Sequence, residues 1–212
     1  HVAKSAGASW RRVQLLDVGG NPGKDYERKI ARVVNYTSLD FAILPTSWTK
    51  NVILGNIQRT NHHIADGTFD VVTAFNVFEH IAAPWKAAAE MKRLVRDNGF
   101  MVLEAPFAWR YHAYPMHVYG YTHTGLRYLF ESEGGVQALY CAYSNLGVTV
   151  HGHYRDHSDE PPDANLIKQV GLLCIFQLNR SAKFDPESLD HNEAFKGPMA
   201  ARVADHRQHV HC

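Results

Sequence analysis

The stretch that decides the fold is Val13-Gln14-Leu15-Leu16-Asp17-Val18-Gly19-Gly20-Asn21-Pro22-Gly23. Its first half is apolar and short enough for a buried parallel strand, and it ends at an acid followed by glycines and a proline. Residues 25–31 then carry a helical pattern. We therefore expect a strand, a tight turn and a helix. At such a turn glycines let a ligand approach the backbone, and the helix N-terminus offers it unpaired amide groups.

The spacing of the glycines narrows the choice of ligand. A dinucleotide fingerprint, G-x-G-x-x-G, beginning at Gly19 would require glycine where Asn21 and Lys24 stand, so that interpretation fails. Asp17, Gly19 and Gly23 instead match acid-x-Gly-x-x-x-Gly, which resembles the cofactor loop of class I S-adenosylmethionine-dependent methyltransferases. Asn21 replaces the middle glycine of that loop, and asparagine tolerates a positive φ. A plain glycine-rich turn in another α/β protein is the alternative.

Polar residues at the ends of the next two predicted strands extend this site. Residues 32–40 form a β-branched strand that closes on Asp40, and an acid there can accept both hydroxyls of a ribose. A short strand over 51–54 precedes Asn56, where the methyltransferases commonly have an acid that meets the adenine amine. The amide oxygen of Asn56 accepts the same hydrogen bond without the charge. The alternatives are an ordinary turn aspartate and a plain loop asparagine.

Residues 66–106 carry the most extended resemblance. A strand over 69–75, the pair Glu79-His80, a helix from Pro84 to Gly99 and a strand over 100–106 follow one another. This order resembles the fourth strand, helix and fifth strand of type-11-like small-molecule and sugar methyltransferases. The resemblance implies that S-adenosylmethionine is the cofactor, and that Gly20 and Asn76 join the residues named above in binding it.

The Glu79-His80 pair raises the question of a metal ion. Some members of the superfamily bind Mg²⁺ through E-x-x-E-H at this place, but Asn76 stands where the first acid would be. Losing one anionic oxygen weakens any Mg²⁺ site, so we expect no metal. A structural role for His80, tying the strand end to the next loop, is the alternative to a chemical one.

Residues 108–122 form an aromatic loop past the end of a core strand, at the edge where open α/β sheets bind ligands. Together with the following helix they resemble the "HxYPxDxxRxTxxGLxxLF" stretch of methyltransferases from glycan and secondary-metabolite pathways. His117 stands in place of the usual acid and Gly120 in place of the usual arginine. A packed lid with no ligand beneath it is the alternative.

The last third of the chain completes the predicted sheet. We expect a helix over 125–131 capped by Thr122 or Thr124, then strands over 136–143 and 170–178, the second apolar and therefore central. Residues 144–165 between these strands contain three histidines (His151, His153 and His157). They could chelate a metal ion, but an exposed loop is the favoured interpretation because no fourth ligand completes the set.

The composition of the chain limits its size class, its partners and its compartment. A chain of 212 residues that is 45% hydrophobic can bury one core, and 22 basic against 21 acidic residues indicate neither nucleic acid nor anionic membrane as a partner. Three scattered cysteines (Cys141, Cys174 and Cys212) predict no disulfide framework and no thiolate metal site. No apolar run of membrane-spanning length and no signal peptide stand out, so we expect a cytoplasmic protein. The chain begins at His1 without a methionine, which leaves an upstream targeting segment or fused domain open.

The resulting prediction is a Rossmann-like, doubly wound, mostly parallel seven-stranded α/β sheet in a domain spanning 1–180, followed by a polar, histidine-rich tail over 181–212. The resemblance implies methyl transfer to a hydroxyl, or another nucleophile, of a sugar or small metabolite. A hydroxyl must lose its proton, and His112 is the preferred base, with His80 as the second candidate. Two alternatives are an inactive binding or scaffold protein and a nicotinamide-dependent oxidoreductase, the latter disfavoured by the glycine spacing.

Overall fold

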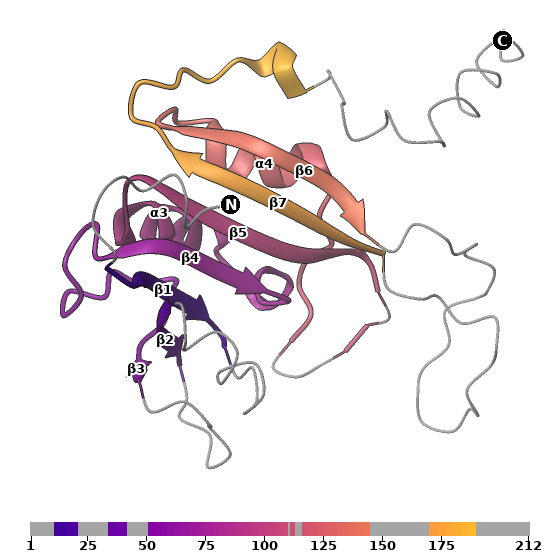
Figure 1. Cartoon of the computed structure of the whole chain (residues 1–212). Coiled ribbons are helices and arrows are strands. Elements are labelled where there is room, and N and C mark those ends of the chain that lie inside the picture. Colours follow the sequence, from indigo (N-terminus) through magenta and orange to yellow (C-terminus); the bar gives the residue numbers. More distant parts are fainter. Residues whose placement is uncertain are drawn as a thin grey trace, which may run out of the picture.

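The computed structural model describes residues 11–20, 34–41, 51–109, 111–112, 116–144 and 170–189. These residues form one seven-stranded sheet with helices packed on it (Figure 1). The strands are β1 (Val13–Val18), β2 (Val34–Asp40), β3 (Val52–Leu54), β4 (Phe69–Phe75), β5 (Val95–Ala108), β6 (Val136–Ser144) and β7 (Val170–Leu178). The helices are α3 (Pro84–Leu94), α4 (His123–Glu131) and two 3₁₀ turns, η1 (Phe78–His80) and η2 (Pro186–Leu189).

The strand order is β3-β2-β1-β4-β5-β7-β6, with β3 and β6 at the two edges (Figure 1). The five strands from β3 to β5 pair in parallel, whereas β7 pairs antiparallel with both β5 and β6. The chain winds outward from β1 in one direction and from β4 in the other, so the order reverses between these two strands. Open α/β sheets bind ligands at the carboxyl ends of such strands. The predicted doubly wound, mostly parallel sheet is confirmed.

The core lies where apolar strands meet α3 and α4. The side chains of Leu16, Val72 and Met101 are fully buried on the central strands, and β4 is buried from Phe69 to Ala74. The two helices contact each other as well as the sheet, so they cover the same face (Figure 1). Strands with neighbours on both sides and a helix above them have few exposed positions, and this explains their continuous apolar runs. The prediction of a central seventh strand is confirmed, because β7 lies between β5 and β6.

The helix that begins at Pro84 is shorter than its sequence suggests. It was expected to reach Gly99, but α3 ends at Leu94 and the next residues already belong to β5. Val95 is buried and pairs with Phe69, so it serves the sheet and not the helix. A Cβ at Gly99 would lie 2.8 Å from the carbonyl oxygens of Arg96 and Asp70. The glycine therefore permits close strand contact and is not a helix cap.

The sequence analysis expected no disulfide framework and did not foresee the single disulfide that the structure contains. Cys141 on β6 and Cys174 on β7 face each other in the antiparallel register and form a disulfide, with their Cα atoms 4.0 Å apart. Their 33-residue separation in sequence carries no sign of this pairing. Only the pairing of the two strands brings the sulfur atoms together.

The remaining predictions divide into those that the structure addresses and those that it does not. Thr122, and not Thr124, caps α4, because its hydroxyl accepts a hydrogen bond from the Gly125 amide at 2.9 Å. The first part of the predicted tail, residues 181–189, packs against α4, where Arg127 donates to the Ser188 carbonyl. The helix over 25–31, the three histidines of 144–165 and Cys212 lie outside the described residues. No described helix is both long and apolar enough to cross a membrane.

Candidate cofactor and catalytic site

A cavity of about 360 Å³ opens at the carboxyl ends of the first four strands. Four residues predicted to bind the cofactor line it, namely Gly19, Asp40, Asn56 and Asn76. His80, one of the two predicted bases, lines it as well. The other lining residues are mostly apolar: Val18, Leu39, Phe41, Gly55, Ile57, Gln58, Val77, Ile81 and Met116. Strand order therefore brings together residues from four separate parts of the chain.

The turn after β1 is built so that only glycine fits its first position. Gly19 has a φ of +67°, and a Cβ there would lie 2.7 Å from a methyl group of Val77. Its amide donates to the Leu39 carbonyl at 2.8 Å, which holds the turn against the end of β2. The backbone at Gly19 consequently forms part of the cavity wall.

Asp17 lies beneath this turn and does not line the cavity. Its carboxylate accepts hydrogen bonds from the Tyr36 and Thr73 hydroxyls, each at 2.7 Å, and the residue is 4% exposed. Burial raises the pKa of Asp17, and the two hydroxyl donors oppose that rise. Gly20 also stays outside the cavity lining, with its carbonyl accepting from the Ser38 hydroxyl at 2.7 Å. In the described structure Asp17 therefore supports the turn from below.

Tyr36 and Thr73 are functional neighbours that the sequence analysis did not single out. Both are polar-tipped residues inside strands, and Thr73 pairs directly with Asp17 in the parallel register. Polar tips within otherwise apolar strands on both sides of a buried acid were the available signal. Gly23, the last glycine of the predicted loop, lies outside the described residues.

The asparagines of the cavity have distinct local roles. Asn56 accepts a hydrogen bond from the Gln58 amide through its side-chain oxygen at 2.9 Å, which orders the loop after β3. Asn76 has a φ of 53°, a left-handed conformation that asparagine adopts more readily than most residues. The backbone amide of Asn76 donates a hydrogen bond to the Glu104 carbonyl at 2.8 Å, and this contact connects the end of β4 to β5. A contact with the backbone at Asn56 and the backbone conformation at Asn76 therefore explain why asparagine occurs at these two positions of the cavity rim.

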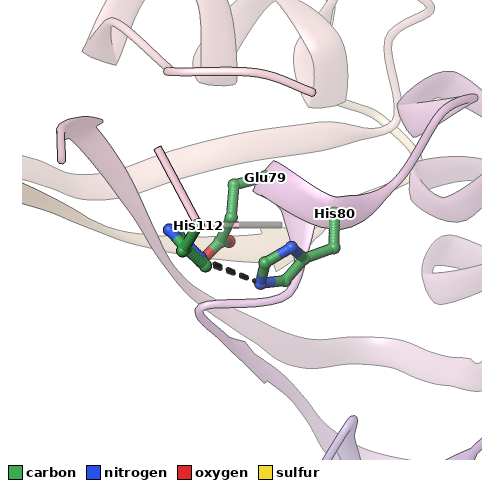
Figure 2. Close-up of side chains that lie close together, drawn as sticks. All are labelled: Glu79, His80 and His112. Atoms are coloured by element: carbon green, nitrogen blue, oxygen red, sulfur yellow. Dashed lines mark hydrogen bonds and ion pairs between the residues drawn. The ribbon is translucent and has the colours of Figure 1, made fainter. Parts of the chain in front are cut away.

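Beside the cavity, the side chains of two consecutive residues, Glu79 and His80, meet that of His112 from a later part of the chain (Figure 2). We call Glu79, His80 and His112 the histidine cluster. The Nε2 atoms of His80 and His112 lie 3.3 Å apart, and Oε1 of Glu79 is 3.7 Å from Nε2 of His80. The other ring nitrogen of His80, Nδ1, lies 2.9 Å from the Met116 carbonyl oxygen. One donor atom from each residue lies within 4.8 Å of the other two, a spacing at which a metal ion could also be held.

Glu79 is unusual among the charged residues of the site. It is 1% exposed, and its Oε2 has no hydrogen-bond partner among the described residues. Burial raises the pKa of Glu79, and the nearby histidines His80 and His112 oppose the rise. A buried carboxylate next to two imidazoles is the kind of environment in which proton transfer is tuned.

The loop between β5 and α4 is held across the cluster by backbone hydrogen bonds. The Val118 amide donates to the Glu79 carbonyl at 2.7 Å, and the Tyr121 amide donates to the Pro106 carbonyl at 2.9 Å. A Cβ at Gly120 would lie 2.8 Å from the Phe107 carbonyl oxygen. Gly120 therefore lets the loop lie directly on β5.

Aromatic side chains of this loop divide between the core and the surface. Tyr121 is buried and donates to the Phe78 carbonyl at 3.1 Å. Trp109, Tyr111 and Met116 are between 41% and 48% exposed near the cluster. His117, found where an acid is usual, stacks on Tyr111 with the rings 8° from parallel and lies with its ring 4.6 Å from that of His112. The described loop is thus partly packed and partly open to a ligand.

Comparison with known proteins agrees with this architecture. Residues 16–103 match the family described as "Methyltransferase domain". Two curated relatives, each named only as an uncharacterized methyltransferase, come from Mycolicibacterium gilvum and Mycolicibacterium vanbaalenii. They are 30% and 32% identical over 105 residues, which is 47% of this chain and 41% of each relative. The chain therefore spans about two fifths of the length of the curated relatives it matches.

Solved structures show the same fold at low sequence identity. The YcgJ protein of Bacillus subtilis has a TM-score of 0.57 at 13% identity, covering 85% of this chain and 97% of that one. The 1,6-didemethyltoxoflavin-N1-methyltransferase of Burkholderia thailandensis, solved with S-adenosylhomocysteine bound, has a TM-score of 0.56 at 15% identity, covering 80% and 72%. Residues 16–103 are thus similar to a methyltransferase domain, and the described residues share their fold with a solved methyltransferase.

Proposed function

We propose that this protein transfers the methyl group of S-adenosylmethionine to a hydroxyl of a sugar or another small metabolite. The observation that carries the proposal is the cavity itself. It gathers predicted cofactor contacts from four strand ends and has His80 of the histidine cluster in the same wall. Cofactor and proton acceptor would therefore stand side by side.

The cofactor side of the proposal assigns a role to each polar residue of the wall. Asp40 accepts the ribose hydroxyls, Asn56 meets the adenine amine, and the Gly19 backbone approaches the amino acid part of the cofactor. Asn76 contributes at the end of β4. Asp17 acts from below by holding the shape of the turn through Tyr36 and Thr73.

The acceptor side rests on the exposed aromatic residues and the histidine cluster. Flat apolar faces with polar tips suit a sugar ring or a similar partly apolar ligand. In-line methyl transfer is accelerated mainly by positioning, so the site has to hold an oxygen near the sulfonium methyl. His112 takes the hydroxyl proton, and His80, which lines the cavity and lies 3.3 Å from His112 between their Nε2 atoms, is the second candidate.

Two measurements test the proposal against its alternatives. Calorimetric titration with S-adenosylhomocysteine should show binding, whereas titration with NAD should not; the reverse result would favour the oxidoreductase. Release of S-adenosylhomocysteine should then be followed with S-adenosylmethionine and a panel of sugars and hydroxylated metabolites. Cofactor binding without turnover on any acceptor would favour a scaffold protein.

A further inference from the structure

The two facing histidines impose a definite placement of hydrogen atoms. Nδ1 of His80 lies 2.9 Å from the Met116 carbonyl oxygen, which can only accept a hydrogen bond. Nδ1 of His80 must therefore carry a hydrogen. Because a neutral imidazole carries one N–H, Nε2 of His80 then holds a lone pair.

The hydrogen position on His80 also determines the hydrogen position on His112. Their Nε2 atoms lie 3.3 Å apart, and the lone pair on His80 requires the hydrogen of this contact to sit on Nε2 of His112 (Figure 2). The lone pair of a neutral His112 is consequently on Nδ1. We propose that the Met116 carbonyl, His80 and Glu79 form a positioning chain that makes Nδ1 of His112 the basic atom of the site.

Glu79 completes this chain as a counter-charge. Its carboxylate is buried, lies 3.7 Å from Nε2 of His80, and leaves Oε2 without a hydrogen-bond partner among the described residues. Charge interactions are stronger in such a poorly solvated place than in water. A positive imidazole pair would therefore be stabilised here, as the buried acid stabilises the imidazolium of a catalytic triad.

The remaining charged and titratable groups around the pair are few in the described structure. Glu104 on β5 adds negative charge near Glu79. Burial raises the pKa of Tyr121, and the neighbouring Tyr119 and Glu79 add to that rise. The His117 ring lies 4.6 Å from the His112 ring on the other side. Two carboxylates and three imidazoles therefore lie in or next to the cluster.

The proposed step balances in atoms and charge. The acceptor oxygen bonds to the methyl carbon, the bond from that carbon to sulfur breaks, and the hydroxyl proton moves to Nδ1 of His112. The sulfonium loses its positive charge as the imidazole pair gains one. Glu79 thus offers a fixed negative charge at the place where positive charge arrives.

The inference rests on the proposed function for its chemical step, but its hydrogen placement can be measured without any acceptor. Nitrogen-15 spectra of the full chain labelled at histidine report the tautomer of each ring. Spectra of His80→Ala and His112→Ala identify the two residues. We expect His80 as the Nδ1–H tautomer, which is the less common one, and His112 as the Nε2–H tautomer. His80 found as Nε2–H would overturn the proposal.

A metal ion is the competing occupant of the cluster and has a distinct outcome. An ion bound by both Nε2 atoms would displace the hydrogen between the rings. If EDTA changed the histidine signals of the purified protein and Zn²⁺ restored them in wild type but not in His112→Ala, the cluster would be a metal site and the positioning chain would be wrong.

The role of Glu79 is tested by the isosteric variant Glu79→Gln. We expect normal S-adenosylhomocysteine binding, turnover reduced about 10- to 100-fold, and an ascending limb of the pH–rate profile moved about one unit to lower pH. Glu79→Asp, which keeps the charge, should recover part of the rate, whereas the exposed matched control Glu133→Gln should behave as wild type. Unchanged turnover and pH profile in Glu79→Gln would remove Glu79 from the chain. Failure to bind S-adenosylhomocysteine in wild type would instead contradict the proposed function alone.

Discussion

At the scale of single residues, Asp40 is the sharpest test of the cofactor site, since it ends β2 and lines the cavity. Asp40→Ala should weaken S-adenosylhomocysteine binding by about 1–3 kcal/mol, because hydrogen bonds from ribose hydroxyls to a carboxylate are lost. Calorimetric titration measures the change. Asp97→Ala, at an exposed residue near the start of β5 that does not line the cavity, serves as the control and should bind normally. Equal affinity in both variants would take Asp40 out of the site.

His112 tests the acceptor side at the same scale. His112→Ala should bind S-adenosylhomocysteine normally and turn over about 10² to 10⁴ times more slowly, which is the usual contribution of a general base. Steady-state kinetics with an identified acceptor, together with calorimetry, separate the two effects. His123→Ala is a suitable control, because that histidine contacts Tyr143 on β6 and is not part of the histidine cluster. A near-normal rate would make His112 structural and direct attention to His80.

At the scale of elements, the pairing of β6 with β7 carries the Cys141–Cys174 disulfide. Protein unfolded without reductant should titrate one thiol out of the three cysteines in the chain, and three after reduction. Reduction should lower the free energy of unfolding by about 2–5 kcal/mol, the usual cost of losing a native disulfide. Urea unfolding with and without reductant measures that cost. Three thiols in the unreduced protein would show that the pair is not bonded.

At the scale of the whole molecule, Asp70 joins three parts of the sheet. Its carboxylate on β4 accepts hydrogen bonds from the Gln14 amide of β1, from Arg11 before β1 and from Arg96 on β5. Burial alone would raise the pKa of Asp70, but these donors and the Arg96 charge outweigh it, so the pKa is lowered. The folded protein therefore holds this group deprotonated to lower pH than the unfolded chain does.

The lowered pKa of Asp70 predicts how the free energy of unfolding depends on pH. The contribution of Asp70 is present above the ordinary aspartate pKa, near 4, and is lost as the pH falls through the lower folded-state value. Asp70→Asn should cost about 1–3 kcal/mol at pH 7 and flatten the loss of stability below pH 4. Urea unfolding from pH 3 to pH 7 measures both effects, with the exposed Asp97→Asn as control, which should change stability by less than about 1 kcal/mol. An unchanged acid slope in Asp70→Asn would contradict the assignment.

Much of the cofactor side was predictable from local sequence. Glycines after an apolar run predict a strand followed by a ligand-binding turn, and Asp40 and Asn56 follow later strands in the same way. The strands and the cavity-lining positions were predictable because turn chemistry and apolar periodicity depend on neighbours in the sequence. They could not reveal that Asp17 faces Tyr36 and Thr73 below the turn, since strand pairing decides which way a side chain points.

Only the tertiary structure decided how the histidine cluster is arranged. His112 meets His80 across 32 positions of sequence, and a backbone carbonyl at Met116 determines which ring nitrogen carries the hydrogen. Cys141 and Cys174 pair for the same kind of reason, because β7 returns antiparallel between β5 and β6. The sequence by itself determined the class of fold and, through short-range patterns, several of the residues that line the cavity. The opposition of distant side chains depends on strand order and loop path, and no local pattern encodes these.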